Sequence, residues 1–257
     1  MEILLICLAA FFASLLTFFS GFGLGTILMP VFALFFPLEM AIALTGVVHL
    51  LNNLFKMYLV GKEANWRIVI QFGAPAIVSA LIGAWILMSF SETTAWYTYT
   101  LGSKEFVITP IKVMIAILIF AFAFLELLPF FKKLEFDENK LFFGGVISGF
   151  FGGLSGHQGA LRSAFLIKCG LSKESFIATG VMISSVIDIS RVSVYFTKYS
   201  SMGIEENINL LLAAVLAAFA GALIGKKLLK KITTTFVQIT VAVMIMLMAI
   251  AIGLGVL

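Results

Sequence analysis

Polar and ionisable side chains recur at helical spacing within two apolar stretches of the sequence. Each set has members separated by four and then three residues, which places all three on one face of a helix. Ionisable groups cost about 2.5–3.5 kcal/mol at the centre of a membrane helix, so they mark candidate functional positions. Amide, imidazole and cationic groups together are suited to holding a small anion. The two sets are His49, Asn53 and Lys56, and, 135 residues later, Ser184, Asp188 and Arg191.

Two of these basic residues also have a simpler interpretation. Lys56 and Arg191 lie about one turn from the ends of their predicted helices, where long basic side chains can extend to the lipid headgroups. Asp188 precedes Arg191 by three residues, so the two can pair within the helix and fix the direction of the guanidinium. Both interpretations stay open for Lys56 and for Arg191.

Glycine-containing breaks interrupt two apolar segments, at "SGFGLG" (20–25) and "LSGHQGALR" (154–162). Helices that begin at Thr26 and near Gly159 would direct their unpaired N–H groups and positive dipole ends toward the membrane centre, where an anion can use them. Glycine permits the unusual backbone angles of such a turn, although close helix packing is an alternative reason for it. The candidate residues are Gly21, Gly23, Gly25, Thr26, Ser155, Gly156, His157, Gln158, Gly159 and Arg162.

The second break carries the more polar side chains. Ser155 and Gln158 have the spacing of a capping box, and His157 adds a donor that changes charge near neutral pH. Arg162 lies in the first turn after the break, and its planar fork of donors matches a carboxylate, sulfonate or similar oxyanion. Arg162 and Arg191 are therefore the two candidates for charge recognition.

The composition indicates an integral membrane protein. Hydrophobic residues make up 61% of the 257 positions and charged residues 12%, against about 25% charged in soluble domains. Six apolar runs reach the roughly 20 residues that cross about 30 Å of hydrocarbon as a helix. The runs are continuous rather than alternating, which excludes a β-barrel. They span residues 40–60, 68–90, 108–131, 175–196, 208–229 and 234–257.

Two halves of the chain match when the sequence is shifted by 135 residues. Gly21 then aligns with Gly156, Asn53 with Asp188 and Lys56 with Arg191. Further along, "ALIG" at 80–83 recurs at 222–225, and its larger offset is explained by seven extra residues in the loop "TKYSSMGIEEN". We predict an all-α fold of two homologous halves that form one functional unit. The first half, 1–133, contains a broken hairpin at 3–36 and helices at 40–60, 68–90 and 108–131. The second, 134–257, contains a hairpin at 141–170 and helices at 175–196, 208–229 and 234–257.

The basic residues decide between two topologies for the broken segments. If each segment crossed the membrane once, the basic residues would divide almost evenly between the two sides, against the positive-inside bias. If each turns back to its starting side, only Lys104 and Lys198 lie outside. Each half then makes three net crossings, so the repeat is inverted and both termini of this multi-pass protein of the cell membrane face outward. The cytoplasmic residues would be Lys62, Arg67, Lys132, Lys133, Lys140, Lys168, Lys173, Lys226, Lys227, Lys230 and Lys231.

Other patterns limit the cofactors and partners. Cys7 and Cys169 are isolated in apolar segments, so no disulfide framework or metal site is predicted. The net charge of +4 reflects basic loops on one side rather than a nucleic-acid partner. Glu2 precedes the first apolar run and no Lys or Arg does, so this segment is expected to be retained rather than cleaved as a signal. We expect no cofactor, and membrane lipid and a small anion as partners; the oligomeric state is not predicted.

The sequence resembles the TauE/SafE family, the sulfite-exporter type of membrane permease. The resemblance rests on "SGFGLGTILMPVFALF" with "EMAIALT", on "SGHQGALRSAFLIKCGLSKESFIATG" and on "GALIGKKL", and it spans nearly the whole chain. It implies transport of sulfur-containing anions such as sulfite or organosulfonates, with the glycine-rich hairpins along the substrate path. The chain departs from the family's usual "GxGGG" pattern at Leu24 and in "HQGA".

Discontinuous helices at matching positions of inverted halves are typical of the midplane site of a secondary transporter. We therefore expect an anion carrier that alternates access between its halves and is not an enzyme, with a proton on His49, His157 or Asp188 as a candidate coupling ion. An anion channel is an alternative. A rhomboid-like serine protease is another, since "GLSG" (153–156) matches its motif, but no histidine follows His157 to act as the base.

Overall fold

The structure is a computed structural model that describes residues 2–20, 24–90, 94–128, 135–199, 207–228 and 234–256. It consists of apolar helices and one small β-hairpin. The long helices are α1 (Glu2–Ser20), α3 (Leu38–Val60), α4 (Trp66–Phe90), α5 (Pro110–Leu127), α7 (Leu141–Ser155), α9 (Lys173–Tyr199), α10 (Ile208–Leu228) and α11 (Thr234–Gly253). The shorter elements are α2 (Leu24–Ala33), η1 (Gly61–Glu63), η2 (Glu138–Lys140), α8 (Gly159–Leu166), β1 (Tyr97–Leu101) and β2 (Lys104–Ile108).

The predicted membrane segments are helices in the structure. Four stretches of the described chain are long and apolar enough to cross a membrane: Leu38–Glu63, Trp66–Phe90, Lys173–Thr197 and Ile208–Lys227. Shorter apolar helices accompany them in α1, α2, α5 and α11. The protein is thus a multi-pass helical membrane protein, as the composition predicted.

Polar residues at the ends of the apolar runs begin the helices. The Asn65 side chain accepts from the Ile68 N–H at the start of α4, and Ser172 accepts from the Ser175 N–H at the start of α9. Thr109 accepts from the Lys112 N–H, with Pro110 as the first residue of α5. Such caps pair N–H groups that have no partner within the helix.

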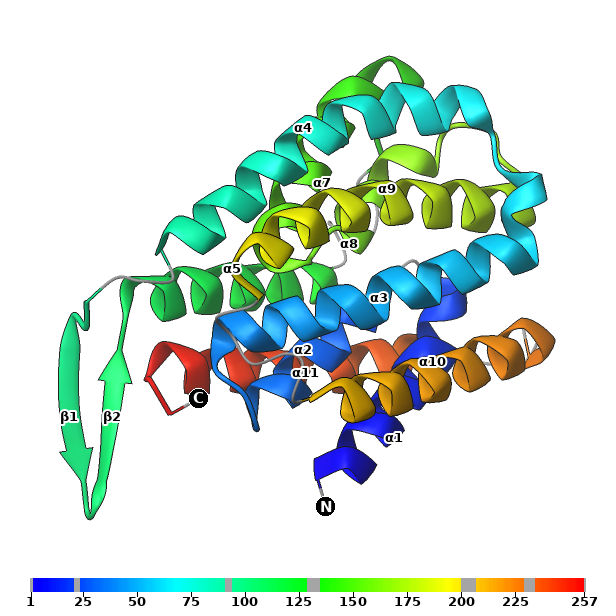
Figure 1. Cartoon of the computed structure of the whole chain (residues 1–257). Coiled ribbons are helices and arrows are strands. Elements are labelled where there is room, and N and C mark those ends of the chain that lie inside the picture. The colour runs from blue at the N-terminus through cyan, green and yellow to red at the C-terminus, as the bar shows by residue number, and fades with distance from the viewer. Residues whose placement is uncertain are drawn as a thin grey trace.

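The helices form two outer pairs around a central pair. α4 packs along α7 and α1 along α10, while α3 and α9 lie between these pairs and contact each other (Figure 1). α5 packs along α11. Three apolar clusters fill the spaces between helices, and the buried polar side chains gather along α3, α9 and the second break.

Glycines allow the outer pairs to approach closely. A Cβ at Gly83 of α4 would lie 2.2 Å from the Phe150 carbonyl oxygen of α7, and one at Gly221 of α10 would lie 2.2 Å from the Phe11 carbonyl oxygen of α1. Neither position has room for a larger residue. Gly221 begins the small-residue stretch "GALIG" (221–225), and such small residues are typical of close contacts between membrane helices.

A β-hairpin follows α4 and projects away from the helices (Figure 1). Strands β1 and β2 pair in antiparallel fashion from Tyr97↔Ile108 to Leu101↔Lys104, with Gly102 at a φ of 66° in the two-residue turn. The Tyr99 hydroxyl donates to the Leu254 carbonyl oxygen, so the hairpin lies beside the end of α11. The all-α prediction did not include this element, although alternating residues around Gly-Ser are typical of a hairpin.

Charged side chains gather at the end of the molecule where α3 connects to α4. Arg67 lies 3.7 Å from Glu138, and Lys168 lies 3.8 Å from Asp137. Lys226 donates to the Leu59 carbonyl oxygen at 3.1 Å. Basic residues that the sequence assigned to one side of the membrane thus lie at one end of the structure, away from the β-hairpin.

Candidate functional site

Asp188 is the centre of a buried polar cluster between α3 and α9. Its side chain is fully buried. From α3, His49 Nδ1 donates to Asp188 Oδ2 at 2.6 Å, and Asn53 Nδ2 donates to the same oxygen at 2.9 Å. The two residue sets predicted from helical spacing therefore face each other, which brings together side chains that are 135 and 139 positions apart in sequence.

The second carboxylate oxygen of Asp188 faces donors from its own helix and from the second break. Arg191 Nε donates to Oδ1 at 2.9 Å, and Gln158 Nε2 does so at 3.4 Å. Arg191 is completely buried, and it is held on the helix face of Asp188 by this i,i+3 pairing. Four side chains from α3, α9 and the break thus donate to one carboxylate.

Gly156 ends α7 and lies against the Arg191 guanidinium. Its φ of 82° is in the left-handed region, and its N–H donates to the Gly152 carbonyl oxygen, as in a helix C-terminus closed by glycine. A Cβ at this position would lie 2.7 Å from Arg191 Nη1. Glycine is required here for the backbone angle and for the close approach of the arginine.

The capping box predicted at Ser155 and Gln158 is wrong. Ser155 is the last residue of α7, and its hydroxyl donates to the Phe151 carbonyl oxygen one turn earlier. Gln158 is the N-cap position of α8 but makes no side-chain cap there. Its amide turns to Asp188 instead. A capping box at these residues needs a helix that begins at Gly156, whereas α8 begins at Gly159.

The start of α2 approaches the second break. A Cβ at Gly25 would lie 3.8 Å from the Gly156 carbonyl oxygen and 4.0 Å from His49 Cδ2, and Thr26 beside it is buried. Gly25 does not have a positive φ, so the need for an unusual backbone angle is wrong at this position. Gly21 and Gly23 lie outside the described residues.

Arg162 and Lys56 bring two further positive charges to the cluster. Arg162, in the first turn of α8, is 8% exposed and its Nη1 donates to Ser184 Oγ. Lys56 is 5% exposed, and Arg162 is a charged neighbour of it. Neither Lys56 nor Arg191 extends to the protein surface, so the interpretation that they only snorkel to the headgroups does not describe these side chains.

Several buried polar atoms of the cluster have no hydrogen-bond partner among the described residues. Arg191 is the most informative, because its Nη1 is one of these atoms while its Nη2 lies 2.9 Å from Asp188 Oδ1 in an ion pair. Buried donors without partners are costly, so an acceptor that paired with them would be favoured here. The other atoms are Thr45 Oγ1, Asn52 Nδ2, His157 Nε2 and Gln158 Oε1.

The sequence matches the family described as Sulfite exporter TauE/SafE over residues 6–252. The chain belongs to this family. The match includes both breaks and every residue of the buried cluster. No curated protein and no solved structure matches the chain. The family is one of membrane transporters, which agrees with a polar cluster enclosed by apolar helices.

In this TauE/SafE protein the second break contributes more side chains to the cluster than the described part of the first. His157 Nδ1 donates to the Ser155 carbonyl oxygen at 3.0 Å, and its ring stacks on Phe122. Ser148 of α7 donates to the Gln158 carbonyl oxygen and so fixes the turn. Gly159 begins α8 directly after these residues.

Two polar residues near the site were not among the candidates chosen from sequence. Thr45 is buried on the His49 side of α3, and the Tyr195 hydroxyl donates to the Gly153 carbonyl oxygen at 2.6 Å. Thr45 precedes His49 by four residues and Tyr195 follows Arg191 by four, so helical spacing was a signal that could have identified them. In the described chain, His, Cys, Asp and Glu side chains form no group of three that would hold a metal ion.

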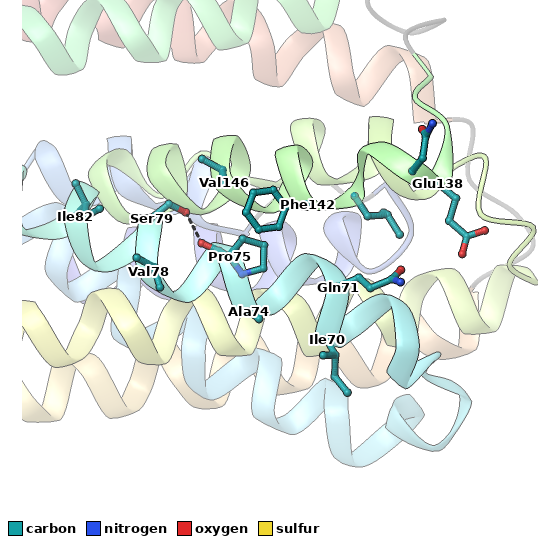
Figure 2. A pocket seen from close by; sticks show the side chains of 12 residues that line it. Ile70, Gln71, Ala74, Pro75, Val78, Ser79, Ile82, Glu138, Phe142 and Val146 are labelled. Atoms are coloured by element: carbon teal, nitrogen blue, oxygen red, sulfur yellow. Dashed lines mark hydrogen bonds between the residues drawn. The ribbon is translucent and has the colours of Figure 1, made fainter.

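A separate groove of the TauE/SafE protein lies between α4 and α7. Figure 2 shows Pro75, Val78 and Phe142 along it, with Glu138 at one end. None of the candidate residues from the sequence lines this groove, and its lining is mostly apolar. It is therefore not a site for recognising a charged substrate.

Proposed function

We propose that the protein is a secondary transporter for small anions, in particular sulfur oxyanions such as sulfite or organosulfonates. The observation that carries this proposal is the buried Arg191 guanidinium, whose Nε and Nη2 face Asp188 and whose Nη1 has no hydrogen-bond partner among the described residues. Arg162 and Lys56 add positive charge nearby, and α8 begins at the same place. A guanidinium and a helix N-terminus both favour an oxyanion.

The anion would bind between the two breaks. The proposed binding residues are those chosen from the sequence, with Gly25 and Thr26 on one side and Gly156 to Gly159 on the other. The approach of Gly25 to the Gly156 carbonyl oxygen supports a single site rather than two. Thr45 and Asn52 have buried polar atoms without partners in the described chain, and we add them to the site.

We propose further that the halves 1–133 and 134–257 form an inverted repeat that alternates access to this site. Corresponding helices pack in corresponding ways: α1 on α10 as α7 on α4, and α3 on α9 across the centre. The cluster is closed to solvent, and this burial supports a carrier over an open channel. Flux in proteoliposomes separates the two, because a carrier saturates and shows counterflow.

The orientation follows from the basic residues, and we propose that both termini lie on the outer side of the cell membrane. Arg67, Lys168 and Lys226 lie at the end of the molecule opposite the β-hairpin, which supports one basic cytoplasmic face. Tags at residues 64 and 135 should be inaccessible from the outer face of intact cells. Labelling of either tag from outside would contradict the topology.

The protease alternative is not favoured by the geometry at Ser155. Its hydroxyl donates to the Phe151 carbonyl oxygen, and His157 donates to the Ser155 backbone oxygen rather than facing the hydroxyl. A nucleophilic serine needs a base within hydrogen-bond reach. Loss of peptide cleavage in Ser155→Ala would support the enzyme, whereas anion transport without cleavage would remove it.

A thermal-stability screen tests the substrate class. Sulfite, thiosulfate, sulfonates, sulfate and carboxylates are added to the purified protein, and a stabilising anion should lose its effect in Arg191→Ala and Arg162→Ala. Arg67→Ala is the matched control, because its side chain is 74% exposed and pairs with the surface residue Glu138. If no anion raised the melting temperature of the wild-type protein, the substrate class would be wrong.

A further inference from the structure

Asp188 accepts hydrogen bonds from the same side chains that the proposed function assigns to the substrate. His49, Asn53, Gln158 and Arg191 all donate to its two oxygens. A carboxylate and a sulfur oxyanion both carry negative charge on oxygen atoms that accept hydrogen bonds, so they need the same donors. In this closed state the donors are therefore occupied by an anion that belongs to the protein.

The charges of the cluster favour this interpretation. Lys56, Arg162, Asp188 and Arg191 are the buried Lys, Arg, Asp and Glu residues of the described chain, so three buried basic groups accompany one buried carboxylate. A second anion at Arg191 would lie close to Asp188, and repulsion between like charges is strong away from bulk water. Neutralising Asp188 with one proton removes this repulsion and leaves the basic groups without a counter-charge.

Other groups around Asp188 must be considered as proton carriers. α3 brings His49 and Lys56, the break brings His157, α8 brings Arg162, and α9 itself brings Arg191 and Tyr195. α7 contains no ionisable side chain, and α4 contains only Arg67, which is exposed. η1 also packs against α9, and its Lys62 and Glu63 are exposed. Among these groups, only Asp188 occupies the donors that the substrate needs and becomes uncharged when it binds a proton.

We propose that the Asp188 carboxylate is an internal anion that competes with the substrate, and that the substrate binds together with one proton on Asp188. The proton comes from water, converts the carboxylate to a carboxylic acid and frees the guanidinium and amide donors. Proton and anion then occupy the same state of the carrier and cross together. The inference rests on the proposed function and adds to it the identity of the coupling residue.

Anion binding to the wild-type protein and Asp188→Asn tests the competition. The probes are methanesulfonate and sulfate, whose charges do not change between about pH 5 and pH 8, and calorimetry gives their affinities. Wild-type affinity should rise as pH falls, by up to about tenfold per pH unit for one coupled proton. Asp188→Asn should bind independently of pH, about tenfold or more tightly than wild type near pH 8.

His49→Gln is the matched variant, because it removes a titratable donor to the same carboxylate but leaves Asp188 in place. Its affinity should keep the wild-type pH slope. A slope that is lost in His49→Gln and kept in Asp188→Asn would assign the proton to His49 and overturn the proposal. Weaker binding by Asp188→Asn than by wild type at every pH would also overturn it.

A measurement on the wild-type protein remains decisive if the variant does not fold. Anion binding in weakly buffered solution should take up about one proton per anion, because linkage is reciprocal. No uptake, or release, with clear anion binding contradicts the role of Asp188 but leaves the anion site in place. Absence of binding by either probe in both proteins would instead count against the proposed function.

Discussion

Helices α3 and α9 occupy corresponding positions in the two proposed halves but carry different chemistry. α3 contributes neutral donors through His49 and Asn53, whereas α9 contributes the buried carboxylate and guanidinium of Asp188 and Arg191. Asn53 and Asp188 are equivalent positions in the alignment of the halves, and they hydrogen bond to each other at 2.9 Å. Two aligned positions thus carry unlike side chains that contact each other, and most of the buried charged residues lie in 134–257.

Removing Arg191 should have the largest effect of any single change in this comparison. Arg191→Met leaves Asp188 buried without its paired cation, which costs about 3–5 kcal/mol of unfolding free energy. Asn53→Ala removes one hydrogen bond to the same carboxylate and should cost about 1.5–3 kcal/mol. Thermal and denaturant unfolding in detergent measure both variants. Equal costs would mean that the two halves contribute alike.

The double variant Asp188→Asn/Arg191→Met separates stability from recognition. Replacing both partners of a buried ion pair is often neutral, so most of the stability lost in Arg191→Met should return. Anion binding should not return, because the guanidinium is absent. Recovery of binding together with stability would show that Arg191 only balances Asp188.

Adding a Cβ in either outer helix pair should lower stability by a similar amount, whereas substitutions in α3 and α9 should have unequal effects. Gly83→Ala and Gly221→Ala each insert a Cβ within 2.2 Å of a backbone oxygen, and overpacking costs about 1–3 kcal/mol. Gly73→Ala in the same α4 is the control, because nothing lies within 4 Å of its Cβ. It should be neutral or slightly stabilising. A large loss of stability at only one of Gly83 and Gly221 would argue against equivalent packing of the α4–α7 and α1–α10 pairs.

The two breaks differ in how strictly they need glycine. Gly156→Ala requires a left-handed backbone angle, which costs about 1–2 kcal/mol, and it moves the Arg191 guanidinium. Gly25→Ala introduces only an ordinary contact at 3.5 Å to Thr45, and Ala is favoured over Gly in a helix by about 0.5–1 kcal/mol. Unfolding and anion affinity should therefore fall in the first variant and stay near wild type in the second. Equal losses would contradict the asymmetry of the breaks.

Most of the helical fold was predictable because apolar runs end at polar residues. The runs predicted at 68–90 and 175–196 became Trp66–Phe90 and Lys173–Tyr199, whose starts are set by Asn65 and Ser172. The β-hairpin was not predicted, although its residues alternate around Gly102 in the sequence. Ser155 was misjudged because local spacing cannot tell the last residue of one helix from the cap of the next.

The site was predictable one helix face at a time. Spacing placed His49 with Asn53, and Asp188 with Arg191, and both faces are buried as expected. The hydrogen bond from Asn53 to Asp188 depends on how α3 packs against α9. The spacing of residues along one helix does not predict this packing. The duplication was the one long-range signal, and it related these two positions without indicating that they touch.

Substituting Arg67 should have the smallest effect on stability and anion affinity of the changes considered. Its role should differ from that of Arg191 because it is exposed rather than buried. Its side chain is 74% exposed and lies 3.7 Å from Glu138, which is 46% exposed. Solvent and salt screen such a pair, so Arg67→Ala should change stability by at most about 0.5 kcal/mol and leave anion affinity unchanged. A double-mutant cycle with Glu138→Ala measures the coupling directly. A coupling as large as that between Arg191 and Asp188 would mean that burial does not separate the two arginines, and the case for Arg191 as the recognition group would lose its main support.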